Sequence, residues 1–283
     1  MKRILMSAGV FLLLAACTGQ LKETGVEAKQ TIPALQEGDV MAGVNLTVAE
    51  GKRLIAKGIA NLPQVKERLK SGTIVITTGS TNTYVAEELI GLAEPHGSFV
   101  IGYITPRGKG IPRDYKNTKD IVIINGEWVD TDFAEVLRKA DENVIVFKGA
   151  NILNYEKKQS AVYFTSEDGG PARMVNETRA QLIIPIGLEK EIFGDLNDYA
   201  QLLDSKNERL SSLPRLWIHK RGEIFTEIEA IKAIASVNVV PYAAGGIAGR
   251  EGGVSFAVYG KREEVQKVLD FVATIQGEAP FIE

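Results

Sequence analysis

The stretch TIVITTGSTNTYVAEELIGL, residues 73–92, joins an apolar run, a loop of threonine, glycine and serine, and a segment with apolar residues at helical spacing. A short run dense in isoleucine and valine, without polar alternation, is typical of a strand covered on both faces of its sheet. Residues 84–92 are predicted to be a helix. The stretch therefore predicts a strand that turns tightly into a helix, which is the building unit of α/β folds.

Similar apolar runs follow along the chain. They are SFVIGYI (98–104), DIVIING (120–126), NVIVFKG (143–149), AVYFT (161–165) and QLIIPIG (181–187). Helices are expected over 133–140 and 195–203, and the segment 46–69 is expected to form two helices that separate at Pro63. Strands that alternate with helices predict an α/β fold with a doubly wound, mostly parallel sheet.

A smaller unit is expected beyond residue 214. Its predicted strands are 215–219, 237–243 and 254–260, and its predicted helices are 227–236 and 262–275. Antiparallel strands backed by two helices form a small α+β unit that resembles a ferredoxin-like fold. The sequence thus predicts an α/β domain over 39–213 and an α+β domain over 214–283.

The N-terminal segment MKRILMSAGVFLLLAAC has the composition of a signal peptide, expected over 1–16. Two positive residues precede an apolar stretch, which is shorter than the about 20 residues of a membrane-spanning helix. The ending Leu14-Ala15-Ala16-Cys17 resembles the lipobox of bacterial lipoproteins, in which the signal is cut before a cysteine that carries lipid.

Cys17 is the single cysteine of the chain, which excludes an intrachain disulfide. The lipobox resemblance implies a lipid such as palmitate on Cys17 and a stable attachment to a membrane surface. Residues 17–38 would then form a polar tether, and the protein would lie outside the cytoplasm on the cell membrane or the outer membrane. The alternative is a signal peptide whose cysteine is incidental.

The amino-acid composition limits the partners that the chain is expected to bind. With 45% hydrophobic residues, 24% charged residues and a net charge of −3, the chain has ample core material and no basic stripe for nucleic acid. The two histidines, His96 and His219, lie far apart and have no cysteine neighbours, which argues against a metal site. A serine nucleophile elbow, a Walker loop and a dinucleotide fingerprint are absent from the sequence, so no cofactor is expected.

The loop at 78–81 points to an anion. In an open α/β sheet, ligands collect at the carboxyl ends of the strands, where a helix start exposes backbone N–H groups. Gly79 allows close approach of the backbone, and Ser80, Thr81 and Thr83 add hydroxyl groups, which together suit a phosphate or a carboxylate. The alternative is that Thr78, Ser80 or Thr81 only caps the helix.

Three segments, taken in order, resemble the type A ribose-5-phosphate isomerases and their wider relatives, the DeoR-type sensors and the CoA-transferase-like proteins. TTGST (77–81) is similar to the phosphate loop, IINGEWVD (123–130) to the aspartate motif, and VFKGANILNYEKKQSAV (146–162) to the segment that carries the catalytic glutamate. The resemblance implies that Lys148 binds substrate, that Glu156 shuttles a proton and that Asp130 is the second aspartate.

The sequence also departs from this family pattern. Asn125 stands in place of the first aspartate, and the spacing from Lys148 to Glu156 is one residue short. A base displaced by one residue of a helix turns by about 100 degrees, away from the proton that it must abstract. A retained phosphate loop with an altered acid and base set predicts ligand binding without isomerase chemistry.

Two functions follow from the sequence. The first is a membrane-anchored protein that binds a small anionic ligand through Thr78, Gly79, Ser80, Thr81 and Lys148. The second is an isomerase-like enzyme or an acyl-transferring hydrolase, in which Glu156 is the base or nucleophile and Asp130 its partner. The sequence indicates neither the identity of the ligand nor the oligomeric state.

Overall fold

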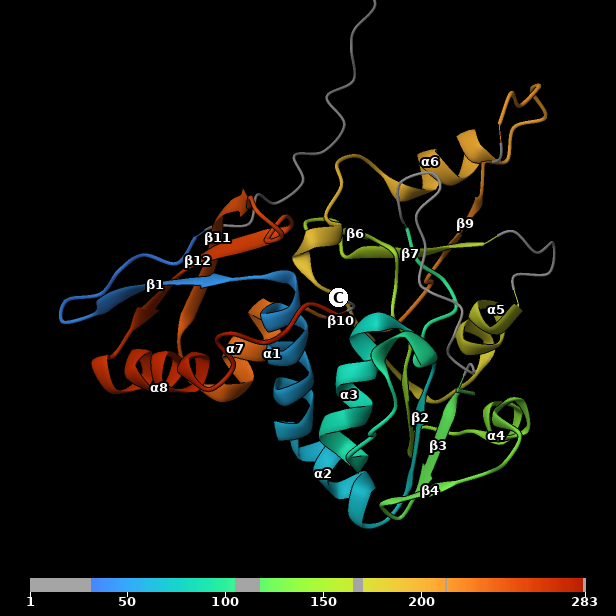
Figure 1. Ribbon diagram of the computed structural model, residues 1–283, viewed down its shortest axis with the longest axis horizontal. Coiled ribbons are helices and arrows are strands. Elements are labelled where there is room, and N and C mark those ends of the chain that lie inside the picture. Colours follow the sequence, from blue (N-terminus) through green and yellow to red (C-terminus); the bar gives the residue numbers. More distant parts are fainter. Residues whose placement is uncertain (1–31, 105–117, 165–169, 212, 282–283) are drawn as a thin grey trace, which may run out of the picture. The chain divides into compact units, whose positions relative to one another are not determined.

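A six-stranded mixed sheet forms the centre of the described chain (Figure 1). The computed structural model describes residues 32–104, 118–164, 170–211 and 213–281; the predicted signal peptide and Cys17 lie outside them. The described residues from Ile32 onward belong to one compact unit of mixed α/β structure with eight α-helices. In this part of the chain, no helix combines the length and the apolar composition of a membrane span.

The strand order of this sheet is β10-β8-β5-β2-β3-β4. The strands are β2 (Thr73–Ile76), β3 (Ile121–Ile124), β4 (Glu127–Val129), β5 (Val144–Phe147), β8 (Gln181–Pro185) and β10 (Glu223–Phe225). The strands β10, β8, β5 and β2 are parallel, whereas β3 runs antiparallel to β2 and β4 antiparallel to β3. The sheet is therefore mixed, with three parallel and two antiparallel pairings, and only β3 and β4 depart from the predicted parallel arrangement.

The turn between β3 and β4 explains the antiparallel direction of β4. Asn125 and Gly126 both have positive φ angles, 52° and 86°, and they connect the two strands directly. A two-residue Asn-Gly turn favours an antiparallel hairpin, because its backbone twist matches that of the flanking strands. The segment IINGEWVD thus folds as a hairpin at the edge of the sheet.

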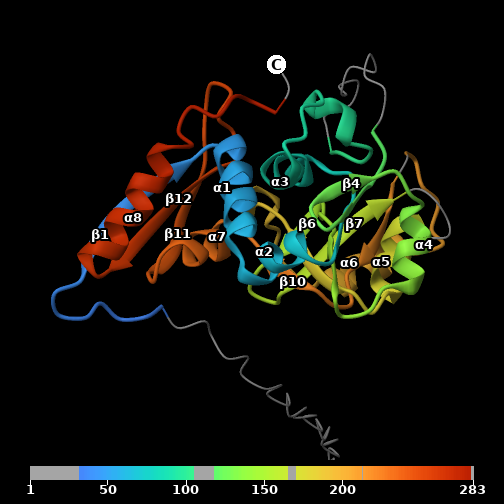
Figure 2. The same ribbon diagram turned by 90° about the horizontal axis from the view of Figure 1, so that it is seen from below.

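Helices cover both faces of the central sheet (Figure 2). The first face packs on α1 (Val48–Asn61), α2 (Pro63–Lys70), α3 (Ser80–Ile90) and α7 (Glu227–Ile234), and the second on α4 (Phe133–Lys139) and α5 (Gly170–Glu177). Within β2, the fully buried Ile74 and Ile76 contribute to the first core and Val75 to the second. Burial of each such side chain stabilises the fold by about 1.5–3 kcal/mol. Because both faces of the strand are buried, successive residues are apolar and the run is unbroken.

Local sequence sets the bounds of α1. The hydroxyl group of Thr47 accepts a hydrogen bond from the backbone of Glu50 at 3.2 Å, and the Glu50 carboxylate accepts one from the backbone of Thr47 at 2.8 Å. This reciprocal pair is a capping box, which satisfies two N–H groups at the helix start. Pro63 follows the extended residue Leu62 and begins α2, so the predicted separation into two helices is confirmed.

Two smaller antiparallel sheets complete the described fold. One has the order β1-β12-β11 and the other the order β6-β7-β9. Their strands are β1 (Val40–Leu46), β6 (Ile152–Asn154), β7 (Gln159–Phe164), β9 (Arg215–Ile218), β11 (Asn238–Gly245) and β12 (Gly253–Gly260), and the remaining helices are α6 (Leu196–Leu203) and α8 (Arg262–Ala273). The predicted boundary at residue 214 separates strands that pair with each other, since β1 pairs with β12 and β10 with β8.

Residues 96–99 form a 3₁₀ helix, η1 (His96–Phe99), where the apolar run predicted a strand. The carbonyl oxygen of Phe99 accepts a hydrogen bond from Gly79 at 2.9 Å. The following residues leave the sheet, and Ile101 is 67% exposed. The strand prediction for 98–104 was therefore wrong: hydrogen bonding to the loop after β2 holds this segment beside the sheet.

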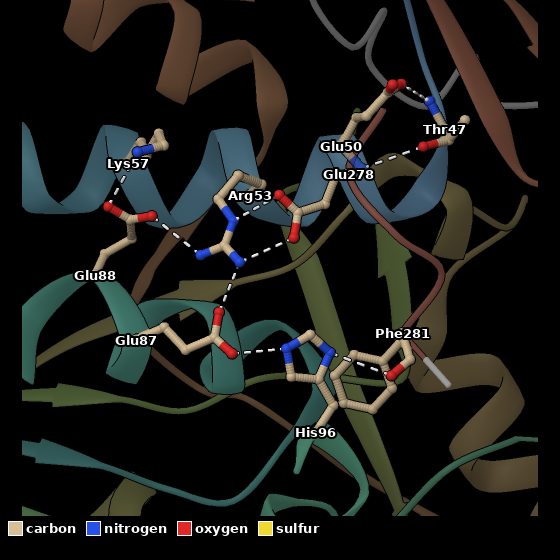
Figure 3. Close-up of polar contacts among 9 residues, drawn as sticks. All are labelled: Thr47, Glu50, Arg53, Lys57, Glu87, Glu88, His96, Glu278 and Phe281. Carbon is tan, nitrogen blue, oxygen red and sulfur yellow. Dashed lines mark hydrogen bonds and ion pairs between the residues drawn. The ribbon is translucent and has the colours of Figure 1, made fainter. Parts of the chain in front are cut away.

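Arg53 on α1 joins α3 and the C-terminal segment (Figure 3). Its guanidinium group donates hydrogen bonds to Glu87, Glu88 and Glu278 at distances of 2.7–3.0 Å. Glu87 also contacts His96 at 2.6 Å, and this hydrogen bond raises the pKa of the imidazole, although burial acts to lower it. These contacts fix α3 against α1, and α3 begins at the predicted ligand loop.

Candidate functional site

A cavity of about 230 Å³ opens at the carboxyl ends of β2 and β5. The structure places all five predicted ligand-binding residues in its wall, namely Thr78, Gly79, Ser80, Thr81 and Lys148. The first four follow β2 and begin α3, whereas Lys148 directly follows β5. Because the two strands are parallel neighbours, their carboxyl ends lie at one edge of the sheet.

The start of α3 has no side-chain cap. Gly79 is the N-cap residue, and no side chain accepts a hydrogen bond from the first turn. The hydroxyl group of Thr83 instead donates to the carbonyl oxygen of Gly79 at 3.0 Å. The alternative that a hydroxyl group of this loop caps the helix is therefore wrong, and the N-terminal N–H groups of α3 keep their capacity for an anion.

Two buried polar atoms in the cavity wall have no hydrogen-bond partner in the described structure. They are the hydroxyl oxygen of Thr81, a residue that is 2% exposed, and the amide oxygen of Asn82, which is fully buried. The amide nitrogen of Asn82 donates to the carbonyl oxygens of Thr77 and Phe147 at 2.8 and 3.1 Å. Asn82 thus ties α3 to the ends of β2 and β5, while its oxygen remains available.

Asp120 brings a carboxylate into the same cavity. Its oxygen accepts a hydrogen bond from the backbone of Thr78 at 2.6 Å. Burial raises the pKa of Asp120 above its ordinary value, although this hydrogen bond and the charge of Lys148 act to lower it. A carboxyl group with a raised pKa can carry a proton that it donates to a ligand.

Lys148 is poorly stabilised as a cation. Burial lowers the pKa of its ammonium group to about 8, the nearby charge of Asp120 acts to raise it, and the charge of Lys190 lowers it further. Within the described residues, its nitrogen contacts the carbonyl oxygen of Gly149, at 3.5 Å. In the described part of the chain, Lys148 forms no ion pair within 4.0 Å, so its nitrogen is available to a ligand.

A buried charge cluster extends from the cavity toward α1 and α7. Lys190 ends the short 3₁₀ helix η2 (Leu188–Lys190) and lines the cavity, with its nitrogen 3.9 Å from the Glu189 carboxylate. Lys52 on α1 contacts the same carboxylate at 3.1 Å. Burial acts to raise the pKa of Glu189, but the charges of Lys52 and Lys190 outweigh it and hold the pKa below its ordinary value.

Glu227 and His219 are two further buried residues around the cavity. Together with Lys52 and Glu189 they form what we call its surrounding shell. Glu227, at the start of α7, accepts a hydrogen bond from the backbone of Leu188 at 3.0 Å, and burial raises its pKa together with the charge of Glu189. Burial lowers the pKa of His219 to about 3, and the charge of Lys148 lowers it as well. The imidazole is therefore neutral beside Lys148 at ordinary pH.

The structure does not bring the two predicted catalytic carboxylates to this cavity. Glu156 is exposed in the turn between β6 and β7. Asp130 is also exposed and lines a separate hollow together with Trp128 and Lys119. Within the described residues, no group of three or more histidine, cysteine, aspartate and glutamate side chains is placed to hold a metal ion.

Asp120 and Lys190 are site residues that sequence reasoning missed. Lys190 follows the apolar run of β8, and a polar residue after a parallel strand is a usable signal, as it was for Lys148. Asp120 precedes its strand, and only the antiparallel direction of β3 brings it to the carboxyl end of β2. The Asn-Gly turn after β3 sets the direction of β4 relative to β3, and it gave no signal for the direction of β3 relative to β2.

Comparison of the chain with protein-family models, with curated proteins and with solved structures finds no match.

Proposed function

We propose that the protein is a membrane-anchored, extracytoplasmic lipoprotein that binds a small anionic ligand in the cavity after β2 and β5. The observation that carries the proposal is the meeting of an uncapped helix start with Lys148 in one cavity wall. Backbone N–H groups at a helix start and a lysine are the groups that hold phosphates and carboxylates. We also propose that the fold is arranged like that of the isomerases that the sequence resembles.

The charge of the cavity wall supports an anion. Among the residues that the structure describes, the charged ones in this wall are the two lysines Lys148 and Lys190 and the carboxylate of Asp120. Glu189 and Glu227 belong to the surrounding shell and do not line the cavity.

The catalytic alternative, with Glu156 as base or nucleophile and Asp130 as partner, has less support. Both side chains are exposed and lie outside the cavity wall that holds Ser80 and Lys148. A general base must reach within hydrogen-bond distance of the proton that it removes. A ligand held at the start of α3 therefore has no contact with either carboxylate, and binding is the function that we favour.

The anchor is tested by Cys17→Ser. We expect this variant to lose all incorporation of radioactive fatty acid and to leave the membrane fraction, because a single cysteine is available for lipid. Labelling in cells and fractionation of the lysate measure the two effects. Undiminished label in Cys17→Ser would contradict the anchor without bearing on the cavity.

Ligand binding is tested by calorimetry of the purified protein against phosphate esters, nucleotides and organic acids. We expect Ser80→Ala to weaken binding by about 2- to 10-fold, since one neutral hydrogen bond contributes about 0.5–1.5 kcal/mol. Lys148→Met should weaken it by more than about 10-fold, because a charge-assisted hydrogen bond is about twice as strong. Lys139→Met is the control, since Lys139 on α4 has a side chain that is 76% exposed. Equal affinity in all four proteins would place the ligand elsewhere.

A further inference from the structure

We propose that Lys148 forms a covalent imine with the carbonyl group of an anionic ligand, such as a 2-oxo acid or an aldehyde that carries a carboxylate. This inference rests on the proposed function, because the same cavity must first hold the anionic group. It adds a reaction to that function and assigns the ligand to a chemical class.

The surroundings of Lys148 favour a neutral amine. A lysine becomes a nucleophile when it is desolvated or when another cation lies close to it. Both conditions hold here, because Lys148 lies in a cavity wall beside Lys190, and among the described residues its nitrogen has one long contact, 3.5 Å, to a backbone oxygen. The pKa of about 8 that results leaves a substantial neutral fraction of the amine near physiological pH.

The neighbouring groups do not compete with this role. Lys190 is engaged with Glu189, which also contacts Lys52, so it supplies charge from a fixed position. His219 is 8% exposed, and burial lowers the pKa of its imidazole to about 3, so it is neutral beside Lys148. Asp120 is the carboxyl group of the same cavity, where it can pass a proton to a bound ligand, and burial raises its pKa.

The reaction balances without a further reactant. The neutral amine of Lys148 attacks the carbonyl carbon, and the carbonyl electron pair moves to oxygen. This oxygen then takes a proton from the nitrogen, which became positively charged on attack, and a neutral carbinolamine results. The carboxylic acid of Asp120 then protonates the hydroxyl group as the nitrogen lone pair expels it as water. The products are a protonated imine, the Asp120 carboxylate and one water molecule.

The cavity restricts the ligand to small molecules. Its volume of about 230 Å³ lies below the roughly 300–1,000 Å³ of most drug-sized ligand pockets. The start of α3 would hold the anionic group, and Lys148 at the end of β5 would face the carbonyl carbon. A molecule that carries these two groups close together, such as a 2-oxo acid, would contact the start of α3 and Lys148 at the same time.

Reductive trapping tests the inference. The purified protein is incubated with pyruvate or glyoxylate and sodium cyanoborohydride, and peptides are mapped by mass spectrometry. We expect Lys148 to be labelled at least ten times faster than any other lysine, with a rate that rises as the pH passes through about 8. Surface lysines should instead gain reactivity toward their ordinary pKa of about 10.4.

Two variants complete the test. Lys148→Arg keeps a positive charge but has no nucleophilic amine, and the selective label should disappear. Asp120→Asn should slow the label on Lys148 at least tenfold, because an amide is not an acid. Label spread evenly over surface lysines in the wild-type protein, with the same pattern in Lys148→Arg, would overturn the imine.

Failure of the imine and failure of the proposed function are distinguished by lactate, a carboxylate without a carbonyl group. Calorimetric binding of lactate, or of another simple carboxylate or phosphate, reports the anion site alone. Binding of such an anion without selective labelling of Lys148 would overturn the imine and leave the anion site standing. Selective labelling of Lys148 by pyruvate supports the imine, whether or not lactate binds tightly.

Discussion

Arg53→Ala is expected to lower the free energy of unfolding by about 3 kcal/mol, because removal of one partner leaves buried charges uncompensated. The guanidinium group contacts three carboxylates, from Glu87 and Glu88 on α3 and from Glu278 in the C-terminal segment. Its side chain is 14% exposed, and its central carbon lies 4.6 Å from the centre of the Tyr84 ring. Alanine would remove the positive charge that these carboxylates share.

The loss should also loosen the ligand site. α3 is held to α1 by Arg53 and by an ion pair of Lys57 with Glu88 at 3.3 Å, and the first turn of α3 forms part of the cavity wall. The backbone of Gly277 donates to Glu50 at 2.8 Å, which brings the C-terminal segment onto the same helix. Arg53 is therefore a structural residue that positions the site from outside it.

Urea unfolding followed by circular dichroism measures the effect of Arg53→Ala. Arg138→Ala is the matched control, because the side chain of Arg138 is 67% exposed and its ion pair with Asp132 is long, at 4.0 Å. An exposed pair of this kind contributes less than about 1 kcal/mol. Equal, small decreases in the free energy of unfolding of the two variants would contradict the prediction. They would show that the carboxylates around Arg53 regain water when the guanidinium group is removed.

The sequence predicted the elements of the fold better than their pairing. The apolar runs that became β2, β5 and β8 were recognised, because strands buried on both faces leave an unbroken signal of isoleucine and valine. β1 and β10 were missed, because one is half exposed and the other has three residues. The run at 98–104 was misassigned, because its backbone hydrogen bonds go to a loop that lies outside any strand pattern.

The site was predictable only where it follows a parallel strand. Gly79, Ser80 and Lys148 come directly after β2 and β5, and the rule that ligands gather at strand ends identified them. Predicting Asp120 would have required the direction of β3. Predicting Lys52 and Glu227 in the surrounding shell would have required the packing of α1 on α7. Residues brought together by tertiary packing leave no local spacing in the sequence.

Gly79→Val is expected to reduce anion binding by at least about 100-fold, which corresponds to about 2.7 kcal/mol, and to leave the fold intact. Gly79 lines the cavity directly before the first turn of α3. A Cβ atom added there would meet only the Cβ atom of Asn82, at 3.9 Å, and the φ angle of 164° is extended backbone that any residue adopts. The methyl groups of valine would therefore fill space that is open to an anion.

The backbone contacts of Gly79 survive this substitution. Its N–H group donates to Phe99, and its carbonyl oxygen accepts from the backbone and the hydroxyl group of Thr83. Valine keeps both groups, so its cost to stability is the poorer N-cap preference, about 1 kcal/mol. Gly43→Val is the control, because Gly43 in β1 also has open space around its Cβ position and lies outside the cavity wall.

Calorimetry with the anion that binds the wild-type protein, together with urea unfolding of each variant, separates a blocked cavity from a damaged fold. We expect the Gly79→Val protein to be folded and to show no heat of binding in calorimetry. The Gly43→Val protein should bind the anion as the wild-type protein does. If Gly79→Val is folded and binds as well as the wild-type protein, the anion cannot lie against the first turn of α3. The N–H groups of that turn would then be bonded to water, and Lys148 would have to hold the anion from the other wall.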